Sequence, residues 1–237
     1  MKEIGPPVYD EWYLTPFGAL CHRLERDALF SLAAFKPGEL VLDAGCGTGV
    51  YLKELKDAGA RPVGLDADAA MLCAAKARGL GVPLVRASLE AMPFKSASFG
   101  GIISVCSLEF VANAALAFKE LSRALSAGGL LLVGFLNLES SWAEKRLEKG
   151  RDPESPWHGV RFFSLAEVEM LGAGAGLKLA GFRSAVHFPP EAEGSDPGKL
   201  EAAEAGGAVL FSRAAFTAAK FRRMDDQEQF VNPRLPP

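Results

Sequence analysis

The sequence has little of what a disulfide-rich, zinc-binding or membrane-spanning protein needs. Its 237 residues include four cysteines and three histidines. The cysteines lie far apart, with no Cys-x-x-Cys pair and no cluster with histidine, so neither a disulfide framework nor a metal site is expected. The longest apolar run covers residues 130–136. A membrane-spanning helix requires roughly 20 such residues, so no membrane span is expected.

An excess of positive charge is also missing. Lysine and arginine number 26 against 29 acidic residues, for a net charge of −3. Dedicated nucleic-acid binders carry a basic footprint, so no nucleic-acid partner is expected. The first residues lack the apolar stretch of a signal peptide, and scattered, reduced thiols suit a cytoplasmic protein. We therefore expect one cytoplasmic domain, as a monomer or homodimer, with a small molecule as its partner.

What the sequence does contain is a regular alternation of strand-like and helix-like segments between residues 39 and 137. The expected strands cover residues 40–42, 61–66, 83–86, 101–105 and 130–135. Helical periodicity appears between them, and Asp68 and Asn113 stand at positions typical of N-caps. This pattern predicts an α/β fold, a Rossmann-like doubly wound sheet of seven strands, mostly parallel, with helices on both faces and an antiparallel edge strand.

The alternation breaks after residue 137. A polar segment with several aromatic residues precedes the next helix, and an insertion of this length favours a lid or substrate loop. Residues 177–188 and 208–216 are expected as two further strands, paired antiparallel, with a polar loop between them. The expected organisation is a helical cover at 1–38, a core at 39–137, the insertion at 138–163, a C-terminal part of the same domain at 164–221, and a tail at 222–237.

The most informative motif is Asp-Ala-Gly-Cys-Gly-Thr-Gly at residues 43–49, directly after the first expected strand. Glycines in such a turn adopt positive φ and let the backbone approach a ligand closely. Amides at the following helix N-terminus suit a carboxylate, and Asp43 suits an ammonium group. The turn therefore offers partners of both signs, as an amino-acid zwitterion requires.

A second acidic residue, Asp66, ends the second expected strand. An acidic side chain at this position can accept hydrogen bonds from both hydroxyls of a ribose. A dinucleotide site has the spacing Gly-x-Gly-x-x-Gly, whereas here the third glycine comes one residue early and Val50 follows it. The spacing therefore disfavours a nicotinamide cofactor.

With these motifs in place, the chain resembles the class I S-adenosylmethionine-dependent methyltransferases, most closely the small-molecule branch that includes the ubiquinone and menaquinone methyltransferases. The segments that carry the resemblance are residues 41–49, 63–72, 89–94 and 121–129, in the family's order. Residues 9–13 and 15–18 are also similar to the N-terminal helices of that branch. The resemblance implies methyl transfer from S-adenosylmethionine to a small-molecule acceptor.

The resemblance also implies a set of cofactor contacts. Residues near the glycine turn would hold the methionine part, Asp66 the ribose, and the residues around Met71 and Ser88 the adenine. The residues expected at the cofactor are Tyr9, Asp43, Ala44, Gly45, Cys46, Gly47, Gly49, Asp66, Ala67, Met71, Ser88, Leu89 and Cys106. Ser88 and Gly100 depart from the family, which favours aspartate at both positions. These departures support an alternative, a non-catalytic cofactor-binding or scaffold protein.

Methyl transfer needs mainly alignment and exclusion of water, so the chemistry requires no particular catalytic residue. Glu109 follows the fourth expected strand and is a candidate for orienting or deprotonating the acceptor; a surface or capping role is the alternative. His158 lies beside Trp157 in the insertion and is the second candidate. Trp12 and its aromatic neighbours either close over the sulfonium or pin the N-terminal helix to the core, and for Trp12 we favour the second interpretation.

Overall fold

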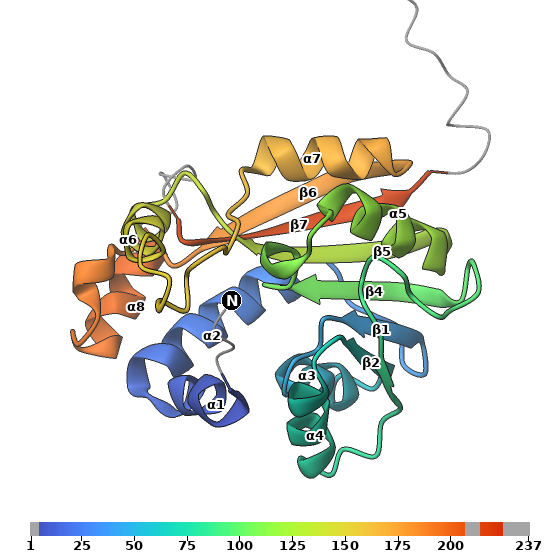
Figure 1. The fold of residues 1–237 in the computed structure, drawn as a ribbon, viewed down its shortest axis with the longest axis horizontal. Helices are drawn as coiled ribbons and strands as arrows, with labels where there is room; N and C mark the ends of the chain where they lie inside the picture. Colours follow the sequence, from blue (N-terminus) through green and yellow to red (C-terminus); the bar gives the residue numbers. More distant parts are fainter. Residues whose placement is uncertain (1–4, 207–213, 225–237) are drawn as a thin grey trace, which may run out of the picture.

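The computed structural model describes residues 5–206 and 214–224, which form a twisted seven-stranded sheet flanked by helices (Figure 1). The strands are β1 (Leu40–Ala44), β2 (Arg61–Asp66), β3 (Leu84–Arg86), β4 (Phe99–Val105), β5 (Leu125–Leu136), β6 (Leu177–Ala185) and β7 (Phe216–Arg223). Their order in the sheet is β3-β2-β1-β4-β5-β7-β6. β7 runs antiparallel to both β5 and β6, whereas β1 to β5 pair in parallel. The predicted α/β, Rossmann-like fold is confirmed.

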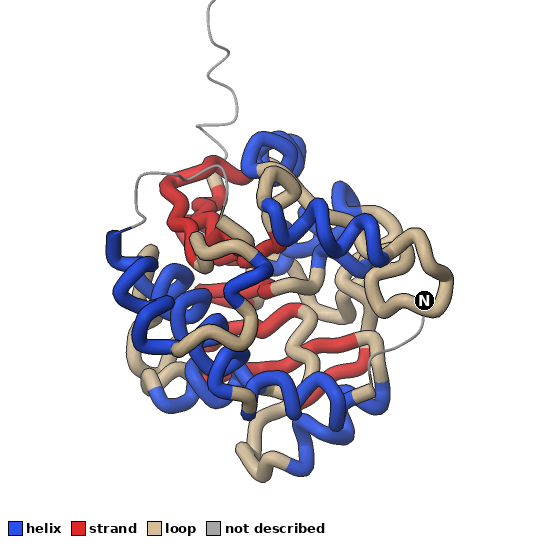
Figure 2. The backbone as a smooth tube through the Cα atoms, turned by 90° about the vertical axis from the view of Figure 1, so that its left-hand side faces the viewer, coloured by secondary structure: helices blue, strands red, loops and turns tan. Residues whose placement is uncertain are grey.

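The helices lie on both faces of the sheet (Figure 2). They are α1 (Pro6–Leu14), α2 (Pro16–Ser31), α3 (Val50–Asp57), α4 (Ala69–Ala77), α5 (Ala114–Ala124), α6 (Ser141–Lys149), α7 (Leu165–Gly174) and α8 (Pro197–Gly206), with short 3₁₀ helices η1 (Leu108–Phe110) and η2 (Pro190–Ala192). The Asp68 side chain accepts from Ala70 N–H, and that of Asn113 from Leu116 N–H. Both predicted N-caps are therefore present.

The sheet is buried on both faces, and successive residues of each strand point alternately into one core and the other. Leu42 and Leu131 are fully buried in the core that contains α5 and α7 side chains. Their neighbours Val41 and Leu132 are fully buried in the second core, with residues of α2 and α3. Central strands therefore appear in the sequence as largely apolar runs, which is why β1, β4 and β5 were predictable.

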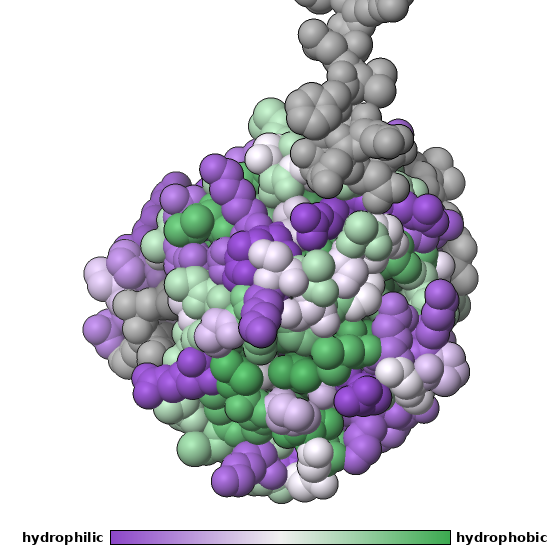
Figure 3. Space-filling view, turned by 90° about the vertical axis from the view of Figure 1, so that its right-hand side faces the viewer, coloured by the Kyte–Doolittle hydropathy of each residue, from purple (hydrophilic) through white to green (hydrophobic). Residues whose placement is uncertain are grey.

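The carboxyl ends of the parallel strands lie at the left of Figure 1, where α1, α6 and α8 gather around them. The strand order reverses between β1 and β4, and in open α/β sheets ligands bind beyond the strand ends at such a point. The opposite end of the molecule faces the viewer in Figure 3, where apolar side chains gather inside a hydrophilic rim. A ligand site is therefore expected at the carboxyl ends of the parallel strands.

The last strand differs from the prediction. A strand was expected at 208–216, but residues 207–213 lie outside the described part, and β7 begins only at Phe216. The expected tail starts at Arg222, but Arg222 belongs to β7. The tail residues from 225 on lie outside the described part. Within this strand, the ammonium of Lys220 donates to the Leu32 carbonyl at 2.9 Å.

Two segments interpreted as irregular contain helices. The insertion at 138–163 holds α6, whose N-cap Ser140 accepts from Ala143 N–H. The expected polar loop at 189–207 contains η2 and α8. Their polar sequences carry weak apolar patterning, so packing against the rest of the molecule decides their structure. Within the described ranges, no helix is long and apolar enough to cross a membrane, and no group of acidic, cysteine and histidine side chains is arranged to hold a metal.

Candidate functional site

The glycine turn after β1 has a backbone shape that other residues would strain. Gly45, Gly47 and Gly49 have φ angles of +84°, +51° and +85°, a region that L-residues with a Cβ rarely adopt. A Cβ on Gly45 would lie 2.4 Å from the Cβ of Ser107, whereas one on Gly47 would meet nothing within 4 Å. The turn therefore packs tightly on one side and is open on the other, as the glycine pattern predicted.

Most amides of this turn are already bonded inside the protein. The N–H groups of Gly45 and Cys46 both donate to the Leu65 carbonyl, at 2.7 and 2.9 Å. The next N–H, that of Gly47, donates to the Asp66 carboxylate. Gly49 is the N-cap of α3 and offers no side-chain acceptor to its first turn. The amides left for a ligand carboxylate are thus those opening α3, not those of Gly45 to Gly47.

Asp66 connects the glycine turn to the start of α4. Its Oδ2 accepts from Gly47 N–H at 2.8 Å, and its Oδ1 accepts from Asp68 N–H at 2.9 Å. A carboxylate offers about four acceptor positions, so two remain for ligand hydroxyls. The side chain is half-buried, which leaves it within reach of a ribose.

Asp43 is a buried carboxyl without a compensating partner. It is 2% exposed, and its Oδ2 has no hydrogen-bond partner within the described residues. Burial, together with the nearby negative charge of Asp66, raises the pKa of Asp43 to about 8. An orphaned carboxylate is costly to bury, so a cationic ligand group beside it would relieve that cost. The site thus fits the ammonium end of an amino acid.

Four expected adenine contacts lie beside Asp66. Ala67 is exposed and Met71 half-buried near the start of α4, while Leu89 is buried. The hydroxyl of Ser88 accepts from Glu90 N–H at 3.1 Å and lies 3.2 Å from Glu90 Oε2. An acidic group therefore stands next to Ser88, although the sequence pattern placed none at that position.

The end of β4 meets the glycine turn through two serines. Ser104 and Ser107 both donate to the Ala44 carbonyl, at 3.0 and 3.1 Å. Between them, Cys106 adopts φ +46° and donates its N–H to Gly134 at 2.8 Å. Burial raises the pKa of the Cys106 thiol well above its usual value, so it stays protonated. These contacts hold Cys106 at the strand end as a neutral side chain.

The two sequence-derived catalytic candidates have different surroundings. Glu109 is 1% exposed; its Oε1 accepts from Leu136 N–H at 2.7 Å, and its Oε2 has no partner in the described part of the chain. Burial raises the pKa of Glu109 to about 7. His158 is exposed, with its Nδ1 2.9 Å from the Gly150 carbonyl oxygen. Glu109 thus lies inside the protein near the end of β5, and His158 faces solvent.

The first helix is fastened directly to the glycine turn. Asp10 accepts from Thr48 Oγ1 at 2.6 Å and from the Arg78 guanidinium at 2.8 Å. Arg78 also donates to the Thr48 carbonyl at 2.5 Å. The preceding residue Tyr9 is half-buried, and its hydroxyl lies 2.8 Å from that of Tyr13. These contacts place α1 beside the turn, and no local sequence pattern indicated them.

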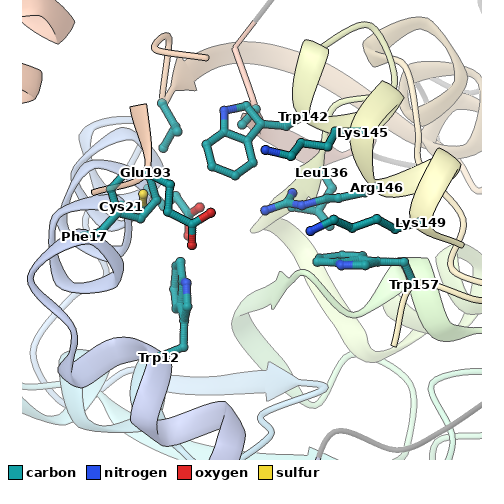
Figure 4. A pocket seen from close by; sticks show the side chains of 13 residues that line it. Trp12, Phe17, Cys21, Leu136, Trp142, Lys145, Arg146, Lys149, Trp157 and Glu193 are labelled. Carbon is teal, nitrogen blue, oxygen red and sulfur yellow. The ribbon is translucent and has the colours of Figure 1, made fainter. Parts of the chain in front are cut away.

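A cavity of about 230 Å³ lies between α1, α2 and α6 (Figure 4). It is lined by Trp12, Phe17, Cys21, Glu25, Leu136, Trp142, Lys145, Arg146, Lys149, Trp157, Val186, Glu193 and Ala215. Trp12 contributes to it as well as packing against the core, so pinning the helix is only part of its role. Neither His158 nor Glu109 lines it. Burial raises the pKa of Glu25 to about 7, and sequence reasoning missed this residue.

Comparison with known proteins gives a family match and several similar proteins. Residues 42–133 match the methyltransferase domain family. An uncharacterized protein of Mycobacterium tuberculosis is 34% identical over 183 residues. The matched segment covers 77% of this chain and 62% of the relative's length. A malonyl-[acyl-carrier protein] O-methyltransferase of Erwinia billingiae is 36% identical over 118 residues, covering 50% of this chain and 47% of the relative.

The fold is likewise shared with a solved methyltransferase structure. A S-adenosylmethionine-dependent methyltransferase from Thermotoga maritima, described as a possible histamine N-methyltransferase, superposes with a TM-score of 0.69. Its sequence is 23% identical, and the superposition covers 91% of this chain and 94% of that one. At this identity the likeness speaks for the fold alone.

Proposed function

We propose that this chain, whose residues 42–133 match the methyltransferase domain family, transfers the methyl group of S-adenosylmethionine to a small-molecule acceptor and releases S-adenosylhomocysteine. The observation that carries the proposal is the buried Asp43 carboxyl, whose Oδ2 has no hydrogen-bond partner among the described residues, beside an open glycine turn and the Asp66 carboxylate. One anion suits the ammonium and sulfonium end of this cofactor, and the other suits its ribose.

Each part of the site has a role in that proposal. The bound cofactor would supply an electrophilic methyl group on sulfur. Asp43 would accept from its ammonium group, the opening amides of α3 would hold its carboxylate, and Asp66 would accept from the ribose hydroxyls. Ala67 and Met71 would flank the adenine, and Ser88, Leu89 and neighbouring Glu90 would meet the adenine edge. Tyr9 and Cys106 would complete the cofactor site.

The acceptor would approach from the cavity between α2 and α6. An O–H or N–H acceptor loses a proton during methylation, so a nearby base helps only if the acceptor is a weak acid or a protonated amine. Glu25 lines the cavity and has a pKa of about 7, which makes it better placed to take that proton than Glu109 or His158.

Isothermal titration of the protein with S-adenosylmethionine tests the cofactor part of the proposal. We expect saturable binding, with competition by S-adenosylhomocysteine and none by NAD or NADP. Binding of a nicotinamide dinucleotide in place of S-adenosylmethionine would overturn it. A panel of acceptors then separates enzyme from scaffold: release of S-adenosylhomocysteine supports the enzyme, and tight cofactor binding without turnover across a broad panel supports the non-catalytic alternative.

Loosening the first helix should weaken cofactor binding without unfolding the protein. The substitution Asp10→Asn removes the charge that binds Thr48 and Arg78. A charge-assisted hydrogen bond contributes about 1.5–3 kcal/mol, so we expect affinity for S-adenosylmethionine to fall roughly tenfold. Glu11→Gln, on the exposed side of the same helix, is the matched control. Equal affinities for both variants in calorimetry would show that α1 does not support the cofactor site.

A further inference from the structure

The cavity-lining face of α6 carries an arginine held between two indole rings. Trp142, Lys145, Arg146 and Lys149 have the spacing of one helical face and all line the cavity. The guanidinium of Arg146 lies 5.0 Å from the ring centre of Trp142 and 4.5 Å from that of Trp157. The Trp142 indole is fixed in turn, because its Nε1 donates to the Phe188 carbonyl at 2.8 Å. Stacking on both sides fixes the orientation of the guanidinium.

Among the described residues, no carboxylate forms an ion pair with this arginine. Arg78 and Arg123 each form an ion pair, whereas the Arg146 side chain has neither a hydrogen bond nor an ion pair to any residue in the ranges 5–206 and 214–224. Burial lowers the pKa of Arg146, and the carboxylates of Glu25 and Glu109 raise it again. Its donors therefore face the cavity, preorganised for an anion in the fork geometry that fits a carboxylate.

The remaining charges of the cavity limit the anion to a single charge. Figure 4 shows the nitrogens of Lys145, Arg146 and Lys149 directed across the cavity toward the side that carries Glu193. Glu25 also lines the cavity, and among the described side chains none of these cations lies within 4.0 Å of either glutamate. With both glutamates ionised, the cavity carries one positive charge in excess. A monoanion matches it, while a dianion would face repulsion from the two carboxylates.

Aromatic side chains set the shape of the occupant. All three tryptophans of the sequence, Trp12, Trp142 and Trp157, line this cavity together with Phe17. Its volume of about 230 Å³ lies below the roughly 300–1,000 Å³ of pockets for drug-sized ligands. Flat rings and a small volume favour a compact, planar or aromatic body.

From these observations we infer that the methyl acceptor is a small monocarboxylate with a flat apolar body, whose carboxylate binds Arg146 between Trp142 and Trp157. That the bound monocarboxylate is the methyl acceptor rests on the proposed function. The carboxylate site itself rests only on the contacts of Arg146. Lys145 and Lys149, which line the same cavity, add positive charge around the anion.

Tryptophan fluorescence tests the inference directly, because every tryptophan of the protein reports on this cavity. Titration with benzoate should quench or shift the emission in a saturable way. Benzamide, of the same shape but neutral, should bind at least about tenfold more weakly, since it lacks the charge-assisted pair. Equal response to benzoate and benzamide would overturn the carboxylate site. Tighter binding of phenyl phosphate than of benzoate would overturn the limit to a monoanion.

Variants then assign the anion to Arg146. We expect Arg146→Gln to weaken benzoate binding at least about tenfold and to leave benzamide unchanged, while Arg146→Lys recovers only part of the loss. Arg151→Gln, an exposed arginine five residues along the chain, should bind benzoate like the wild type. If Arg146→Gln binds benzoate as the wild type does, the assignment fails. Thermal melts of each variant verify that it is folded. The comparison of benzoate with benzamide on the wild-type protein tests the carboxylate site even if a variant fails to fold.

The two proposals fail separately. Binding of S-adenosylmethionine without any preference for benzoate over benzamide would remove the acceptor class and leave the methyltransferase proposal intact. Preferential benzoate binding without binding of S-adenosylmethionine would leave the carboxylate site and remove its interpretation as the acceptor site.

Discussion

Replacing Asp66 with alanine is expected to lower the affinity for S-adenosylmethionine at least about 100-fold. The substitution removes the acceptor for two ribose hydroxyls, each contributing about 1.5–3 kcal/mol. It also leaves the N–H groups of Gly47 and Asp68 without their present partner, which loosens the glycine turn and the start of α4 together. Calorimetric titration of the variant measures the loss.

Asp66→Asn separates charge from shape in this test. The amide oxygen of the asparagine can still accept one backbone N–H. The affinity of this variant for S-adenosylmethionine should therefore lie between those of the wild type and the alanine variant. Asp57→Ala, which removes an exposed carboxylate paired with Lys53, controls for net charge. Retention of near-wild-type affinity by the Asp66→Ala variant would contradict the ribose assignment and weaken the case for the cofactor.

Replacing Asp43 with asparagine should stabilise the ligand-free protein while it weakens cofactor binding. The wild-type carboxyl is buried, its Oδ2 has no partner in the described residues, and its pKa is raised to about 8 from 3.8. A neutral amide avoids most of that cost. At pH 8 we expect a gain of roughly 2 kcal/mol in the free energy of unfolding, about 4–8 °C in Tm. Affinity for S-adenosylmethionine should fall about 100-fold, because its ammonium loses a charged acceptor.

The pH dependence follows from the same carboxyl. Its folded pKa lies above its unfolded value, so its contribution to stability is complete below about pH 3.8 and is lost as pH rises toward 8. Glu25 and Glu109, with pKa values of about 7, act in the same direction between pH 4.5 and 7. The Tm of the ligand-free wild type should therefore fall between pH 5 and 8, and less so for Asp43→Asn.

Cofactor affinity should change in the opposite direction. Binding of a cation favours ionised Asp43, so the affinity of the wild type should rise between pH 6 and 8.5, whereas the asparagine variant should show a flatter profile. Thermal melts and titrations at several pH values measure both effects. A variant that is less stable than wild type at pH 8 and still binds S-adenosylmethionine normally would show that Asp43 has a structural role only.

Local patterns predicted the first half of the fold well. The strand expected at 61–66 coincides with β2, and the caps at Asp68 and Asn113 are those observed. These features depend on neighbouring residues, namely a buried apolar run, a glycine stop and an N-cap side chain. The same holds for the glycine turn at 43–49, whose positive φ angles its glycines indicate directly.

The later elements were harder to predict because distant contacts decide them. The charges of β7 resemble those of a solvated tail, yet Lys220 and Arg223 donate to the carbonyls of Leu32 and Leu125. Trp142, Arg146 and Lys149 have the spacing of one helical face, but the polar composition of the segment gave no clear prediction of a helix. Its partners, Trp157 and Phe188, are recognisable only in the folded chain.

The sequence by itself determined the proposed cofactor site of this protein. Asp43, the three glycines and Asp66 stand at two strand ends that parallel pairing brings together, so their spacing carries the chemistry. The acceptor side was decided only by tertiary structure. Trp12, Glu25 and Arg146 come from α1, α2 and α6, and they meet because helices from distant parts of the chain pack around the carboxyl ends of the sheet. No local pattern records that packing.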